Sequence, residues 1–109
     1  MPDIVWNRDA ALTRLMHNDL LLNKVCALFI RTSPAQVEGI QAAVADNDFS
    51  AAQATAHTLK GASGNIGGEC LMSLCAQIEQ AAKAQDADQL LQLSAELNDT
   101  YQALRAALP

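Results

Sequence analysis

Residues 49–68 read FSAAQATAHTLKGASGNIGG, and this stretch contains both a helical pattern and an unusual polar face. Its apolar and small positions recur in alternating steps of three and four residues: Phe49, Ala52, Ala56, Leu59, Ser63 and Ile66. That spacing predicts an amphipathic α-helix with one buried stripe, in which Ser63 is a small core-facing residue. Gly67 and Gly68 suit the end of this helix and the start of the next.

The polar face of this helix contains a histidine among small residues. His57 lies two positions from Leu59, about 200° around a helix of 3.6 residues per turn, so its ring should project away from the core. The positions three, four and seven residues away share its face: Gln53, Ala54, Lys60, Gly61 and Gly64. Each glycine inside a helix costs about 1 kcal/mol relative to alanine. Close approach by a partner would explain them, and we expect this face to bind one.

The segments before residue 49 also predict helices. Asn7 can cap a short helix, which the polar step at residues 17–19 interrupts, and a second helix should run to about Arg31. We interpret these segments, about residues 7–31, as helices covering the side or end of the fold. Ser33 with Gln36 three positions later fits a capping box, and Pro34 then occupies the first helical position. A third helix is predicted to begin there and to end at residues 46–48.

Two further helices follow the glycine pair. Apolar residues of the first include Leu71, Leu74, Cys75 and Ile78, and Asp86 with Gln89 can cap the second. Four long amphipathic helices with short polar turns, about residues 33–108, predict an all-α antiparallel up-and-down four-helix bundle with one or two additional N-terminal helices. The length of 109 residues suits a single domain over residues 1–109.

Charge and composition narrow the classes of partner. The net charge is −5 and the seven Lys and Arg residues are scattered, which argues against nucleic acid. The three cysteines show no paired spacing, and we interpret them as reduced core residues of a cytoplasmic protein. No stretch approaches the ~20 apolar residues of a membrane span. We expect a monomer without direct membrane contact, located in the cytoplasm or at the cytoplasmic end of a longer membrane receptor.

The residues around His57 also carry a family resemblance. His57-Thr58-Leu59-Lys60-Gly61, with Gly67 six positions later, resembles the His-x-Leu-Lys-Gly motif of histidine phosphotransfer domains. Residues 6–12, 29–34 and 71–79 are similar to family members as well, so the likeness covers nearly the whole chain. The resemblance implies that His57 carries a phosphoryl group and that Lys60 neutralises its charge.

The resemblance further implies an orienting partner for the histidine ring. A glutamate or glutamine on the following helix hydrogen-bonds the ring in such domains, and Glu79 matches that position. One residue past core Ile78, Glu79 should also lie at a seam between helices. By accepting from Nδ1–H, it would favour the tautomer whose Nε2 lone pair faces outward. An ordinary surface pair between Glu79 and Lys83 is the alternative.

The resemblance implies transfer from a receiver-domain phosphoaspartate to His57 and on to another receiver. The sequence shows no P-loop, no Gly-rich loop after a strand and no carboxylate cluster spaced for Mg²⁺. We therefore expect a carrier, not an enzyme, with no cofactor or metal of its own and with Mg²⁺ on the partner receiver only. The partners would be response-regulator receiver domains, on separate proteins or within a hybrid sensor histidine kinase.

Two other functions remain open at this point. The first is a phosphotransfer-inactive helical docking domain, which would have no need to keep His57, Lys60 and Gly61. The second is a metal-binding bundle, which would need inward-facing Glu-x-x-His pairs or clustered Cys and His. Neither His57 nor His17 has such neighbours in the sequence, and we interpret His17 as a residue of a turn or helix end.

Overall fold

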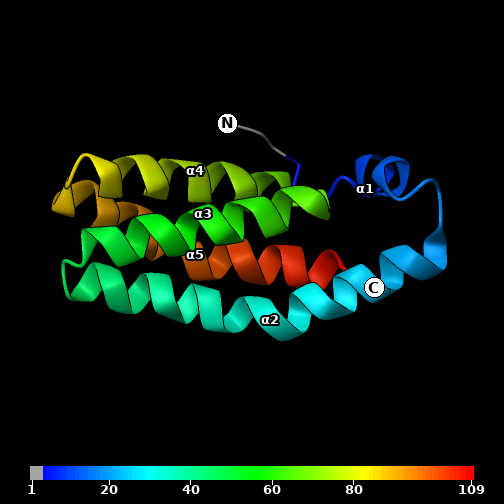
Figure 1. Cartoon of the computed structure of the whole chain (residues 1–109), viewed down its shortest axis with the longest axis horizontal. Coiled ribbons are helices and arrows are strands. Elements are labelled where there is room, and N and C mark those ends of the chain that lie inside the picture. Colours follow the sequence, from blue (N-terminus) through cyan, green and yellow to red (C-terminus); the bar gives the residue numbers. More distant parts are fainter. Residues whose placement is uncertain (1–3) are drawn as a thin grey trace.

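The computed structural model describes residues 4–109, so residues 1–3 of the predicted domain lie outside the described part. Within that part the chain forms five α-helices and no strand (Figure 1): α1 Arg8–Arg14, α2 Asp19–Ala45, α3 Phe49–Asn65, α4 Glu69–Lys83 and α5 Ala87–Ala107. Helix α3 contacts α2 and α4, and α5 contacts the same two helices, so the four long helices close into a bundle. The predicted all-helical bundle is confirmed, and α1 lies at one end of it.

Side-chain caps define the starts of most helices. The side-chain oxygens of Asn7, Asp48 and Asp86 each accept a hydrogen bond from a backbone N–H three residues later, at the starts of α1, α3 and α5. An N-cap of this kind satisfies one of the four backbone donors that a helix start leaves free. The three predicted starts are therefore confirmed. Asn18 caps α2 in the same way through the N–H of Leu21.

The helix boundary predicted at residues 31–34 is wrong, because α2 continues through Pro34. The Ser33 hydroxyl does not cap a new helix: it donates to the Phe29 carbonyl at 2.5 Å and accepts from the Tyr101 hydroxyl at 2.8 Å. A serine that bonds back to the residue four positions earlier stays within a helix. Proline has no N–H for the carbonyl of Ile30 and tends to kink a helix. In Figure 1 the axis of α2 changes direction near its middle.

One buried stripe explains why α2 remains a single helix. Its buried residues follow each other in steps of three or four on both sides of the proline: Leu22, Cys26, Phe29, Ser33, Val37, Ile40 and Val44. Both halves therefore bury apolar surface against the same body, and that burial outweighs a missing hydrogen bond.

The core consists of aliphatic side chains from all four long helices. Its fully buried members include Ile40, Leu59, Leu71, Ile78, Leu90 and Leu97. A second cluster of Ala11, Leu12, Leu22 and Cys26 joins α1 to the first half of α2. Cys26 and Cys75 are buried, as predicted, but the prediction is wrong for Cys70, which is only half-buried near the start of α4. Among the described residues, no helix is long and apolar enough to cross a membrane.

The N-terminal segment holds the end of α3. Trp6 Nε1 donates to the Ile66 carbonyl at 2.7 Å, and the backbone N–H of Asn7 donates to the Gly67 carbonyl at 2.7 Å. The Arg14 guanidinium donates to the carbonyl of Gly64. The carbonyls of Gly64 and Gly67 also accept from backbone N–H groups of the following turn, so these donors add contacts from the N-terminal segment to a helix end that is already hydrogen-bonded. The C-terminal end of the helix that carries His57 is thereby fixed to the N-terminal segment.

Candidate functional site

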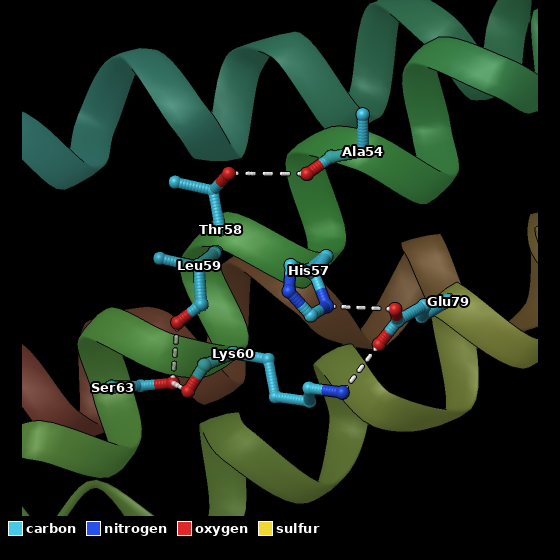
Figure 2. Close-up of polar contacts among 7 residues, drawn as sticks. All are labelled: Ala54, His57, Thr58, Leu59, Lys60, Ser63 and Glu79. Atoms are coloured by element: carbon cyan, nitrogen blue, oxygen red, sulfur yellow. Dashed lines mark hydrogen bonds and ion pairs between the residues drawn. The ribbon is translucent and has the colours of Figure 1, made fainter.

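His57 lies near the middle of α3 with its ring in solvent. Its side chain is 68% exposed, whereas Leu59, two residues later, is fully buried. The predicted outward orientation is confirmed. Figure 2 shows one ring nitrogen directed at Glu79 of α4 and the other on the far side of the ring. One edge of the ring is therefore bonded within the protein, and the opposite edge is open to another molecule.

Glu79 projects from α4 toward α3 at the seam between the two helices. Its Oε2 lies 2.9 Å from Nδ1 of His57, and its side chain is only 15% exposed. An ionised carboxylate can only accept hydrogen bonds, so the ring nitrogen facing it must carry the proton. With Nδ1 protonated in the neutral ring, Nε2 keeps its lone pair on the exposed side.

Lys60 completes a three-residue chain of polar contacts. Its Nζ lies 2.5 Å from Oε1 of Glu79, so the two carboxylate oxygens have different partners (Figure 2). The Lys60 hydrogen bond is the main cause that lowers the pKa of Glu79, with a smaller contribution from His57, while burial acts in the opposite direction. Glu79 therefore remains ionised and acts as an acceptor. The alternative pairing of Glu79 with Lys83 is not found among the salt bridges of the described residues.

A buried thiol lies close to this polar chain. Cys75, one helical turn before Glu79 on α4, is fully buried, and burial together with the Glu79 carboxylate raises its pKa to about 12. The thiol is therefore neutral at physiological pH and resembles a small apolar core residue. It adds no charge beneath the carboxylate.

The two glycines on the face of His57 differ in their surroundings. A Cβ added to Gly61 would meet no atom within 4 Å, so this position is open. A Cβ added to Gly64 would lie 2.8 Å from Sδ of Met72 in α4. Gly64 thus has an explanation within the fold, close packing of α3 against α4, whereas Gly61 has none. Contact of Gly64 with a partner stays a prediction.

An open depression surrounds the ring. Its lining consists of Ser50, Gln53, Ala54, His57, Thr58 and Glu79. Gln53 and Ala54 were predicted as surface for a partner, and the structure places both beside the ring. Ser50 was missed, although it lies seven residues before His57, two helical turns along the same face. Their roles in binding stay predictions.

The remaining sequence interpretations concern residues away from the ring. Ser63 is buried and its hydroxyl donates to the Leu59 carbonyl, as expected for a core-facing residue. Gly67 has φ +81° just after α3 and Gly68 is the N-cap of α4, so the helix end and helix start predicted at this pair are confirmed. His17 lies in the turn between α1 and α2 with φ +59°. Among residues 4–109, no three His, Cys, Asp or Glu side chains are grouped so as to hold a metal ion.

The chain is similar to a known family of domains and to a solved structure. The sequence matches the family described as Hpt domain over residues 24–107. The fold is similar to the crystal structure of the HPT domain from the Hpt sensor hybrid histidine kinase from Shewanella, with 30% sequence identity and a TM-score of 0.75. The similarity covers 94% of this chain and 92% of that chain. The search of curated proteins found no match. The chain therefore belongs to the Hpt domain family, the histidine phosphotransfer domains of two-component signalling.

Proposed function

We propose that this domain is a phosphorelay intermediate, in which Nε2 of His57 accepts a phosphoryl group from a receiver-domain aspartate and passes it to another receiver. The observation that carries the proposal is the exposed imidazole whose Nδ1 faces the Glu79 carboxylate at 2.9 Å. That contact leaves the lone pair of Nε2 on the solvent side, where a partner's phosphoaspartate would reach it.

The first transfer proceeds by attack of the Nε2 lone pair on the phosphorus of the aspartyl phosphate. The N–P bond forms and the P–O bond to the aspartate breaks, so that the aspartate leaves as a carboxylate with the bonding electron pair. The proton on Nδ1 stays on the ring and continues to bond Oε2 of Glu79. The positive charge that develops on the ring therefore faces a carboxylate. The second transfer reverses these steps with another aspartate as acceptor.

Lys60 would supply positive charge near the transferred group. It lies one helical turn after His57 on α3, and its side chain is 32% exposed. A flexible lysine can approach an anion on the ring without any change in the backbone. Gly61, which leaves the adjacent surface open, would allow the backbone of a partner to approach. Gln53 and Ala54 would contact the partner on the other side of the ring.

The domain would act as a carrier, and the remaining chemistry would come from its partner. A receiver domain would bring the Mg²⁺ and most of the transition-state stabilisation for phosphoryl transfer. The donor and acceptor would be receiver domains on separate proteins or within a hybrid sensor histidine kinase. The transfer would occur in the cytoplasm, with this domain acting as a monomer. The similar structure comes from a sensor hybrid histidine kinase, which supports such a setting.

The test uses a receiver domain phosphorylated with radioactive phosphate. Incubation with this protein should produce a label that is stable to alkali and labile to acid, as expected for phosphohistidine. The His57→Gln variant should take up none, and His17→Gln, which changes the histidine in the α1–α2 turn, should be labelled like the wild type. Label persisting in His57→Gln would refute the proposed acceptor.

A further inference from the structure

The Glu79 carboxylate contacts two residues of α3 at the same time. Oε2 lies 2.9 Å from Nδ1 of His57, and Oε1 lies 2.5 Å from Nζ of Lys60. The last torsion of a glutamate side chain is broad and roughly two-fold, so one contact alone would leave the carboxylate free to rotate. Two contacts on two oxygens fix its plane, and the lysine therefore helps to determine where Oε2 lies.

The lysine is also the more protected of the two partners. Its side chain is 32% exposed, against 68% for His57, and its ammonium lies against a carboxylate that is 15% exposed. A charge-assisted hydrogen bond is stronger and more directional than a neutral one, and the effect grows where water is partly excluded. In the unphosphorylated protein the Lys60 ammonium is thus engaged with Glu79.

We propose that Lys60 is a positioning residue in the unphosphorylated protein: it holds the Glu79 carboxylate against Nδ1 of His57 and so selects the tautomer with a free Nε2. This inference rests on the proposed function, because a free Nε2 matters only if His57 is the acceptor. This positioning role is separate from the charge neutralisation proposed above, because it operates before any phosphoryl group arrives.

The electrostatics of the cluster agree with this assignment. Lys60 lowers the pKa of Glu79, which keeps the carboxylate ionised and unable to donate a proton to the ring. The neighbouring Cys75 thiol is buried, and because a thiol is never cationic it cannot replace the ammonium as a charged partner of the carboxylate. Removing the lysine would leave a partly buried carboxylate whose position depends on the ring alone.

The test measures the tautomer of His57 directly by ¹⁵N NMR of protein with ¹⁵N-labelled histidine, without any partner. Lys60→Met keeps the length of the side chain and removes its charge. We expect the ratio of the Nδ1–H to the Nε2–H tautomer to fall about tenfold in this variant, because roughly one charge-assisted hydrogen bond is lost. Lys60→Arg should restore much of the ratio. Lys83→Met, an exposed cation on α4, is the matched control and should change nothing.

A second comparison separates an effect through Glu79 from a direct one. In the Glu79→Ala background the ratio should already be low, and adding Lys60→Met should not lower it further. An unchanged ratio in Lys60→Met, or an equal fall with and without Glu79, would overturn the proposal. The tautomer measurement requires no phosphoryl transfer, so it is independent of the labelling test. His57 could be labelled although Lys60→Met leaves the tautomer ratio unchanged. Conversely, labelling could fail although Lys60→Met lowers the ratio. Circular dichroism confirms that each variant remains helical.

Discussion

Replacing Gly61 should make the protein more stable, although the residue lies one helical turn from the proposed phosphoacceptor. The position is inside α3 and exposed, and an added Cβ would meet no atom within 4 Å. Glycine in a helix interior is less favourable than alanine by about 0.5–1 kcal/mol, because it loses more backbone entropy on folding. Gly61→Ala should therefore raise the free energy of unfolding by about that amount, and the melting temperature by about 2–6 °C.

The assay is urea unfolding followed by far-UV circular dichroism, with Gly64→Ala as the matched control. That Cβ would lie 2.8 Å from Sδ of Met72, so the methionine must move, and the gain in helix propensity is offset. Gly64 is also the penultimate residue of α3, where helix propensity counts for less. Gly61→Ala should be the more stable of the two variants. If the two variants were equally stable, or if Gly61→Ala were less stable than the wild type, the surroundings of position 61 could not be open as described.

The same position tests the approach of a partner. Gly61→Gln adds a long side chain of good helix propensity and should leave the fold intact, yet it would cover the surface beside the ring. We expect slower phosphoryl transfer in a protein whose stability is equal to or above that of the wild type. Stopped-flow or quench measurements with a phosphorylated receiver would show this difference. Unchanged transfer would mean that no partner comes close to Gly61.

Three further predictions concern the rest of the fold. Gly67→Ala should destabilise by about 1–3 kcal/mol in urea unfolding, because Gly67 has φ +81° and a Cβ there would lie 2.3 Å from the Asn7 carbonyl oxygen. Pro34→Ala should stabilise, since position 34 is exposed and alanine restores an N–H for the Ile30 carbonyl; a lower melting temperature would contradict this. The lowered pKa of Glu79 contributes stability that is complete above its ordinary value of 4.5 and lost as the pH falls through the folded value. Glu79→Gln should therefore flatten the acid limb of the curve of stability against pH.

The helices and the direction of His57 could be predicted because they depend on local sequence. A capping side chain and the first turn that it bonds lie within four residues, so Asn7, Asp48 and Asp86 marked three helix starts correctly. The angle between His57 and Leu59 follows from helix geometry alone. The orientation of the ring toward solvent needed no knowledge of the neighbouring helices.

The continuous α2 could not be predicted from its capping pattern. Ser33 and Pro34 look the same at a helix start and at a kink, and the Tyr101 hydroxyl that bonds Ser33 lies 68 residues away. The buried stripe that runs through the proline was present in the sequence, and its steps of three and four residues favoured one helix. A tertiary packing pattern therefore outweighed a local capping pattern.

The contact between Lys60 and Glu79 depends on the register of α3 against α4. Sequence spacing placed Glu79 near the seam, but it gave no distance to either residue of α3. The close packing of Gly64 on Met72, which sets how near the two helices come, is likewise visible only in three dimensions. The sequence therefore predicted the whole face of His57 as surface for a partner, although Gly64 on that face packs against Met72 within the fold.

The central claim is that Nε2 of His57 carries the phosphoryl group. ³¹P and ¹⁵N NMR of the protein, labelled with ¹⁵N-histidine and phosphorylated by a receiver domain, would measure the one-bond coupling between phosphorus and the ring nitrogen. The account predicts a single coupling to Nε2 of His57, with the proton retained on Nδ1. Coupling to Nδ1, which faces Glu79 in the structure, or to the ring of His17 would contradict it.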